Sequence, residues 1–152
     1  MKAAQRHIEL EVKLAKSEAA LRRTLPDARL QITAPPAVAQ IKLALINSDF
    51  QTGPLPASVM HAVIAKPAYW AFCWGSGLAL ARWLLENPDV VANKRVADLG
   101  CGCGIAAIAA KMARAAHVIA CDNDPDALVN AQANAALNDL PLEFCADVAQ
   151  LD

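Results

Sequence analysis

The fold of this chain is decided by the stretch R-V-A-D-L-G-C-G-C-G-I-A-A-I-A-A-K-M-A-R-A-A-H-V-I-A-C-D, from Arg95 to Asp122. A short run, residues 96–99, ends at glycines that recur at positions 100, 102 and 104. An Ala-rich helix is predicted from about Ile105, and a second strand at residues 117–121. The order strand, glycine loop, helix, strand predicts an α/β fold with a parallel sheet, in which the glycines let the backbone turn sharply beside a ligand.

Two carboxylates indicate which ligand this loop binds. Asp122 follows the second strand, where an acidic side chain meets the ribose diol in nucleotide-binding βαβ units. Ile105 stands where the dinucleotide pattern G-x-G-x-x-G has its third glycine, and Asp98 puts a negative charge beside the loop. That charge disfavours a pyrophosphate and favours an ammonium group. S-adenosylmethionine (SAM) carries an ammonium, a sulfonium and a ribose diol, so the loop predicts SAM rather than NAD.

Three motifs resemble a known family. Residues 98–104 resemble the first motif of class I SAM-dependent methyltransferases, and C-D-N-D-P at 121–125 resembles their second motif. Residues 67–91, which begin P-A-Y-W-A-F-C-W-G-S-G, are similar to the segment before the first motif in the electron-transfer-flavoprotein β-subunit lysine methyltransferases. These enzymes belong to the seven-strand protein lysine methyltransferases, with methyltransferases of large-subunit ribosomal proteins as cousins. The resemblance covers residues 67–147 and implies a Rossmann-like α/β fold.

The resemblance also implies roles for single residues. It places Trp74 against the methionine end of SAM, where an aromatic face favours a sulfonium. It also places the Asn123 backbone along the adenine edge and Asp147 on the adenine amine. The alternatives are a core aromatic for Trp74 and an ordinary loop carboxylate for Asp147. The predicted SAM-binding residues are Trp74, Asp98, Gly100, Cys101, Gly102, Gly104, Asp122, Asn123 and Asp147. No side chain is identified as catalytic.

The extent of the chain is the main departure from this family. The resemblance implies a sheet of order 3-2-1-4-5-7-6, and this chain stops after the third strand, predicted at residues 142–145. The fourth strand, and the acidic-aromatic motif that positions the substrate amine after it, are missing. We expect residues 1–66 to form an N-terminal helix and accessory segment, and 67–152 to form the N-terminal half of a methyltransferase domain. Either the chain is a truncated frame or fragment, or a partner chain completes the sheet.

Local patterns predict the remaining elements. A helix is expected over residues 2–25, ended by Pro26. Its apolar residues are one stripe made of Ile8, Val12, Ala15 and Ala19, with Leu10, Leu14 and Leu21 beside it. One strand with a buried face is expected at residues 41–45, and a short helix at 56–66. Trp70, Phe72 and Trp74 lie two apart, which predicts an extended aromatic face, and Ser76 is the expected N-cap of the next helix.

Composition excludes several classes of protein. With 56% hydrophobic residues and a formal net charge of −1, this is a chain that buries a core and lacks the basic excess of a nucleic-acid-binding protein. No apolar run reaches the ~18 residues of a membrane span. Five cysteines, an odd number without a secretory signal, predict reduced thiols in the cytoplasm. No metal site is predicted, because Cys101 and Cys103 lack further ligands at a usual spacing.

The sequence thus predicts a SAM-dependent methyltransferase that acts on a protein lysine amine. The expected partner is a protein substrate, either the electron-transfer flavoprotein β subunit or a ribosomal protein. Three alternatives stay open: a methyltransferase of a small molecule, an incompetent fragment that retains only SAM binding, and, more distantly, a nicotinamide oxidoreductase.

Overall fold

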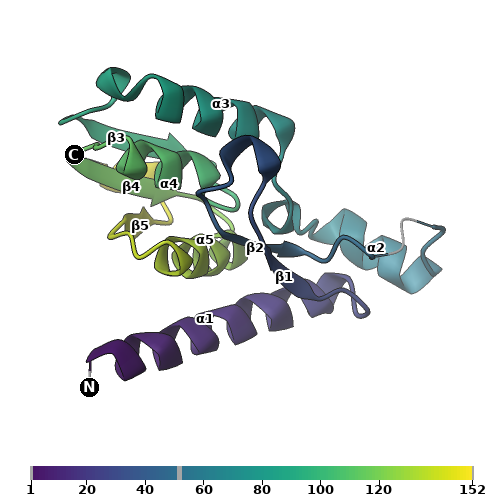
Figure 1. Cartoon of the computed structure of the whole chain (residues 1–152). Helices are drawn as coiled ribbons and strands as arrows, with labels where there is room; N and C mark the ends of the chain where they lie inside the picture. Colours follow the sequence, from purple (N-terminus) through teal and green to yellow (C-terminus); the bar gives the residue numbers. More distant parts are fainter. Residues whose placement is uncertain (1, 51–52, 152) are drawn as a thin grey trace.

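A parallel three-stranded sheet forms the centre of the molecule (Figure 1). The computed structural model describes residues 2–50 and 53–151. Within them β3 (Arg95–Leu99), β4 (His117–Cys121) and β5 (Glu143–Cys145) lie in the order β3-β4-β5. The predicted strands and the α/β, Rossmann-like fold class are confirmed, because consecutive parallel strands are joined by helices.

The connecting helices cover one face of this sheet. Helix α4 (Ile105–Met112) joins β3 to β4, and α5 (Pro125–Leu137) joins β4 to β5. Helix α3 (Gly75–Glu86) packs on α4, and α1 (Lys2–Thr24) packs along α5 (Figure 1). Val118 and Ala120 of β4 are buried, whereas the alternate residues of β3, ending with Leu99 at 60% exposure, face outward. The sheet therefore has one face packed on helices and one open face.

The N-terminal region adds a two-stranded antiparallel sheet. Strand β1 (Leu30–Thr33) pairs with β2 (Leu43–Ile46), and the short helix α2 (Ala57–Ala65) follows. The predicted strand at 41–45 and helix at 56–66 are confirmed to within two residues. Strand β1 was not predicted, because its alternation of apolar and polar residues, L-Q-I-T, spans only four residues, which are largely exposed. Four 3-10 turns complete the described chain: η1 (Pro36–Val38), η2 (Tyr69–Ala71), η3 (Pro88–Val90) and η4 (Val148–Gln150).

The face that α1 buries differs from the predicted stripe. Ile8 is 57% exposed and Val12 is 48% exposed, so the predicted stripe faces solvent. The buried residues of α1 are Ser17, Ala20, Leu21 and Thr24. These buried residues lie in the C-terminal half of α1 and include Leu21, which was predicted beside the stripe; periodicity alone could not show which part of the helix is covered.

The aromatic segment is also arranged differently from the prediction. Tyr69–Ala71 is a 3-10 turn rather than an extended strand, so Trp70 is buried while Phe72 and Trp74 are exposed. Helix α3 begins at Gly75 with Trp74 at its N-cap and no side-chain cap, so the prediction of Ser76 as N-cap is wrong. A helix rich in apolar residues can start without a cap because its packing on α4 stabilises it.

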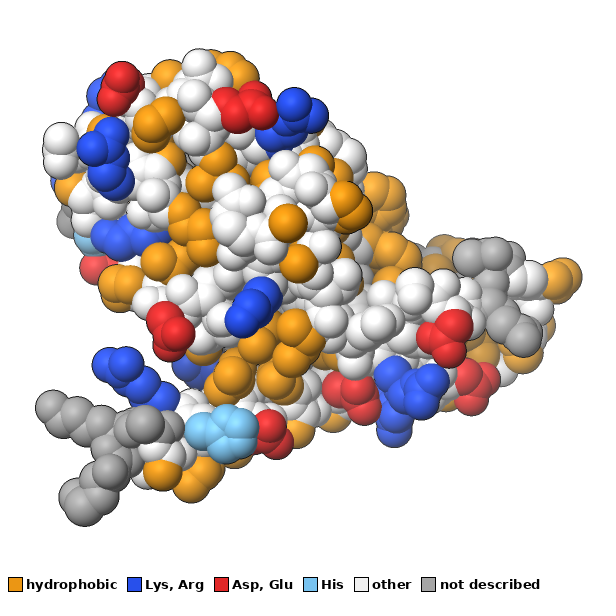
Figure 2. Space-filling model, in the orientation of Figure 1, with side chains coloured by type: hydrophobic (Ala, Val, Ile, Leu, Met, Phe, Trp, Pro, Cys, Tyr) orange, Lys and Arg blue, Asp and Glu red, His pale blue; other side chains and the backbone are white. Residues whose placement is uncertain are grey.

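Charged side chains are mixed over the surface. On the face shown in Figure 2, Lys and Arg side chains are scattered among Asp and Glu side chains. No helix within residues 2–50 and 53–151 is long and apolar enough to cross a membrane.

Candidate functional site

The three parallel strands end level with one another. Leu99 is the register partner of Cys121, and Cys121 is the partner of Cys145. Gly100 and Asp122 therefore begin their loops at the same edge of the sheet. This is the edge at which open α/β sheets bind their ligands.

The glycine loop after β3 depends on left-handed backbone conformations. Gly100, Gly102 and Gly104 have φ angles of +69°, +52° and +78°. A Cβ atom on Gly104 would lie 3.1 Å from Cβ of Ala131, so this glycine also lets the loop approach α5 closely. The Cys101 N–H donates to the Cys121 carbonyl at 2.9 Å and fixes the loop to β4.

Asp122 is held against this loop through its carboxylate. Its Oδ2 accepts from the Gly102 N–H at 2.9 Å, and its Oδ1 accepts from the Asp124 N–H at 3.0 Å. Each carboxylate oxygen has a further lone pair, so the group can still accept hydroxyl donors from a ligand. Asp124 in turn caps α5 by accepting from the Asp126 N–H at 3.0 Å, as the sequence predicted for this N-cap.

A cavity of about 370 Å³ opens beside Asp122. It is lined by Gly100, Cys121, Asp122, Asn123, Ala146, Asp147 and Val148. Its volume is in the range of small-molecule sites, and its lining contains carboxylates but no Lys, Arg or His side chain. Asp147 Oδ1 also accepts from the Ala149 N–H at 2.9 Å, which starts the turn η4. The structure thus brings together four predicted residues: Gly100, Asp122, Asn123 and Asp147.

Asp98 and Trp74 do not line this cavity. Asp98 is half-buried, and its Oδ2 accepts from the Ala107 N–H in the first turn of α4 at 3.0 Å. Burial raises the pKa of Asp98, and the negative charge of Asp122 raises it further. The two negative charges repel each other, and a cation placed near both carboxylates would be attracted by both. Cys101, which was predicted among the SAM-binding residues, is buried within the loop.

Trp74 belongs to an exposed aromatic cluster. Its Nε1 donates to the Tyr69 carbonyl at 2.9 Å, and its ring centroid lies 5.8 Å from that of Tyr69 and 5.7 Å from that of Phe72. The ring is 54% exposed, so the alternative of a core aromatic is wrong for Trp74. The exposed aromatic face can meet a cation or an apolar group.

Two asparagines on α5 and a third at its C-cap were not predicted as important. Buried Asn134 accepts from the Ala44 N–H at 2.7 Å and donates to the Cys103 carbonyl at 2.9 Å, so it connects β2 to the glycine loop. Asn130 donates to the Trp70 carbonyl, and Asn138 bonds the backbone of residue 42. Their spacing of four residues, which repeats one helix face, was the available signal.

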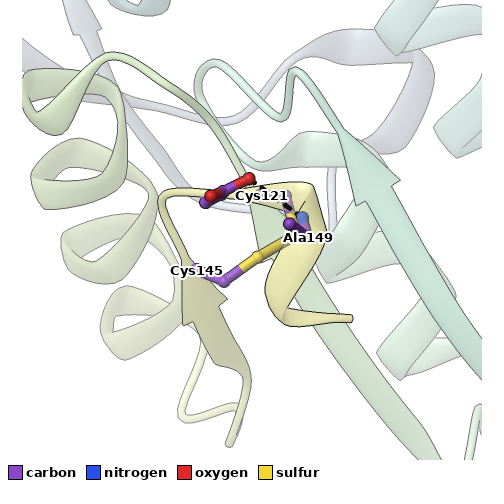
Figure 3. Close-up of a disulfide and its surroundings, with 4 residues drawn as sticks. Cys121, Cys145 and Ala149 are labelled. Carbon is purple, nitrogen blue, oxygen red and sulfur yellow. Dashed lines mark hydrogen bonds between the residues drawn. A yellow bond between two sulfur atoms is a disulfide. The ribbon is translucent and has the colours of Figure 1, made fainter. Parts of the chain in front are cut away.

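Cys121 lines the cavity and is not a free thiol. Cys121 and Cys145 form a disulfide across the ends of β4 and β5, with Ala149 nearby (Figure 3). The prediction that all five thiols are reduced is wrong for this pair, because the parallel register puts the two Cα atoms 4.8 Å apart. Counting cysteines could not show this proximity. Among the described residues, no three His, Cys, Asp or Glu side chains are grouped so that they could hold a metal.

Known proteins share this part of the chain. A family model described as "Ribosomal protein L11 methyltransferase (PrmA)" matches residues 79–150. The electron transfer flavoprotein beta subunit lysine methyltransferase of Danio rerio is 51% identical over 80 residues, which are 52% of this chain and 31% of that protein. The Homo sapiens protein of the same name is 54% identical over 72 residues, which are 47% of this chain and 28% of that protein.

A solved structure is also similar over part of its length. A ribosomal protein L11 methylase from Lactobacillus delbrueckii subsp. bulgaricus has 33% identity and a TM-score of 0.47, over 53% of this chain and 43% of that chain. The chain spans about a third of the length of the curated relatives it matches. Over that shared part the predicted resemblance is confirmed: the chain is similar to methyltransferases, among them the electron transfer flavoprotein beta subunit lysine methyltransferases.

Proposed function

We propose that this chain provides the SAM-binding part of a protein lysine methyltransferase. The observation that carries the proposal is the position of Asp122. Its carboxylate is fixed by two backbone N–H donors at the edge of a cavity whose lining has no basic side chain. Such a site suits a ribose diol on a ligand without phosphates, and a pyrophosphate would meet two carboxylates instead of a cation.

The predicted residues would divide the ligand between them. Asp122 would accept hydrogen bonds from the ribose hydroxyls, while Asn123 and Asp147 would contact the adenine. On the other side of the glycine loop, Asp98 would attract the ammonium group, and Trp74 would offer an aromatic face to the sulfonium. SAM supplies an activated methyl group. The protein then has to align the acceptor amine with this methyl group and to bind the amine in its uncharged form.

The names of the relatives support a protein as the methyl acceptor. The matched curated proteins include lysine methyltransferases of the electron transfer flavoprotein beta subunit, and the family model is named for ribosomal protein L11. We infer a lysine of one of these two proteins as the substrate, with the flavoprotein subunit favoured by the identity of 51% to 54%. In this proposal residues 67–152 bind SAM and residues 1–66 form an accessory segment. We also propose that the protein acts in the cytoplasm.

Calorimetric titration with S-adenosylhomocysteine, the demethylated product, tests the cofactor assignment. We expect saturable binding, and a loss of about 10- to 100-fold in affinity for Asp122→Asn, because charge-assisted hydrogen bonds to the ribose are weakened. Asp89→Asn is the matched control, since it removes the same charge from a side chain that is 97% exposed in η3. Circular dichroism of each variant confirms that the fold is retained.

Two outcomes would overturn the proposal. Equal affinity of Asp122→Asn and Asp89→Asn would refute the ribose contact. Binding of NADH that S-adenosylhomocysteine cannot displace would favour the oxidoreductase. Transfer of a labelled methyl group from SAM to purified flavoprotein, compared with ribosomal protein L11, then separates the two substrates.

A further inference from the structure

The disulfide between Cys121 and Cys145 joins the two chain segments that form the wall of the candidate cavity. Cys121 lines the cavity and directly precedes Asp122, and Cys145 directly precedes Ala146. Apart from Gly100, every residue that lines the cavity lies within three positions of one of these two cysteines. A change in this bond therefore acts directly on the shape of the cavity.

The β4 side of the cavity wall is fixed without the disulfide. Strand β4 is paired with both β3 and β5, and the Cys121 carbonyl accepts from the Cys101 N–H at 2.9 Å. The Asp122 carboxylate accepts from the backbone N–H groups of Gly102 and Asp124. We expect this side to keep its position whether the bond is present or not.

The β5 side is a short strand at the edge of the sheet. Strand β5 has three residues and, among the described strands, pairs with β4 alone. Asp147 accepts from the Ala149 N–H, a bond within the loop itself, and Ala149 lies beside the disulfide (Figure 3). The Asp122 N–H donates to the Cys145 carbonyl at 3.2 Å, and the disulfide adds a covalent link at this point. A short edge strand is a segment that opens easily when such a link is lost.

The register of the sheet selects these two cysteines. Cys121 and Cys145 are partners in the parallel pairing, with Cα atoms 4.8 Å apart, whereas Cys73, Cys101 and Cys103 are free thiols. This separation is within the range of disulfides, so the bond can form and break in the folded sheet. In the cytoplasm, the compartment proposed above, disulfides are mostly transient and redox-sensing.

We propose that Cys121 and Cys145 are a reversible modification site that sets the order of the cavity wall. In the oxidised chain the disulfide holds the loop that carries Asp147 against the end of β4. Reduction by a dithiol releases this loop, while Asp122 stays in place.

The reduction proceeds by thiol–disulfide exchange in two steps. Cys145 is half-buried and Cys121 is buried, so a thiolate of the dithiol attacks the Cys145 sulfur. A bond from the reductant to Cys145 forms, the bond to Cys121 breaks, and the Cys121 thiolate leaves and takes up a proton. The second thiol of the reductant then loses its proton and attacks the reductant sulfur on Cys145. The Cys145 thiolate leaves and takes up a proton. The protein gains two electrons, and the dithiol is oxidised to a cyclic disulfide.

Resting on the proposed function, the released loop would weaken the adenine contact of Asp147 and spare the ribose contact of Asp122. If reduction leaves the bound-like arrangement of the loop populated about a fifth of the time, the apparent affinity for S-adenosylhomocysteine falls about 5-fold. The order of the loop itself can be measured without any ligand.

Mass spectrometry tests whether the exchange occurs in the folded chain. Both cysteines lie in one tryptic peptide, residues 115–152. After treatment of the native chain with dithiothreitol and iodoacetamide, we expect this peptide to carry two alkyl groups, and none without the reductant. Oxidised glutathione should restore the unalkylated form when it is added before iodoacetamide. A peptide that is alkylated only after denaturation would overturn the proposal.

Nitrogen-15 relaxation of the oxidised and reduced chains tests the effect on the cavity. On reduction, the backbone order parameters of Ala146, Asp147 and Val148 should fall from about 0.85 to below about 0.6, while those of β1 and β2 stay unchanged. Cys145→Ser should show the mobile loop without reductant. Cys73→Ser is the matched control, because it removes a free thiol and should retain the full response to reduction.

Two results would overturn redox control of the cavity. They are order parameters near 0.85 in the fully reduced chain and equal affinity of the two forms for S-adenosylhomocysteine. If neither form binds S-adenosylhomocysteine but the loop is released on reduction, the proposed function fails and redox control of the cavity is supported. The two failures are therefore distinguishable.

Discussion

Asn134 is the side chain whose truncation should reveal most about how the glycine loop is held. In Asn134→Ala, the Ala44 N–H and the Cys103 carbonyl lose their partner inside the protein, where the asparagine is fully buried. Each unsatisfied buried group costs about 1–3 kcal/mol. Since neighbouring groups relax partly, we expect a total loss of about 3 kcal/mol in the free energy of unfolding.

Urea denaturation followed by circular dichroism measures this loss. With a slope of about 2 kcal/mol per molar urea, the midpoint should fall by about 1.5 M. Asn138→Ala, at the C-cap of the same helix, is the matched control. Its two bonds to the backbone of Lys42 lie at the surface and its bond to the Asn134 carbonyl is only partly buried, so water can replace them and the midpoint should fall by less than about 0.5 M.

The reasoning is refuted if the two variants shift the midpoint equally, or if Asn134→Ala shifts it by less than about 0.5 M. Either result would mean that water reaches the Cys103 carbonyl and the Ala44 N–H. The slope must also stay constant, because a changed slope would indicate a changed unfolded or native state rather than lost hydrogen bonds.

Three further predictions concern stability. Gly104→Ala should lower the free energy of unfolding by about 2–3 kcal/mol and Gly100→Ala by about 1–2, because both have positive φ but only Gly104 has a close neighbour; equal losses in urea denaturation would contradict this. Asp126→Asn should cost about 1–2 kcal/mol at pH 7. Burial raises the pKa of Asp126, but the hydrogen bonds and charges of Lys66 and Arg23 together outweigh burial and lower this pKa overall. The stabilisation is therefore present above the unfolded pKa and is lost as the pH falls through the lower folded pKa, so the difference from the wild type should vanish as the pH falls below about 4. Cys145→Ser should cost about 3 kcal/mol, as expected for opening a loop of 24 residues, and reductant should then have no further effect on the midpoint.

The central elements were predictable because each has a local signal. Three local signals act within a few residues of the backbone that they determine. They are the short run before Gly100, the recurrent glycines and the Asp-Pro pair at 124–125. The order of strands β3, β4 and β5 agrees with the order that the family resemblance implied. Asp122 and Asp147 gather at one cavity because both come after the carboxyl end of a parallel strand.

What the sequence could not show depends on contacts between distant segments. The buried half of α1 is selected by its packing along α5, more than a hundred residues away. Strand β1 exists because β2 pairs with it, although its own side chains are exposed. The bonds of Asn134 to two remote backbone groups and the disulfide across β4 and β5 likewise need the register of the whole sheet.

The described strands define one side of the candidate site more fully than the other. Most cavity residues come from the loops after β4 and β5, and Gly100 comes from the loop after β3. Strand β4 is paired on both sides, whereas β3 pairs only with β4 among the described strands, and Leu99 at its end is exposed. Asp98 and the glycine loop lie at β3. Under the proposed function, we therefore expect residues on the β3 side of the site to orient the methyl acceptor, so that changes there alter the acceptor without altering the adenosine contacts.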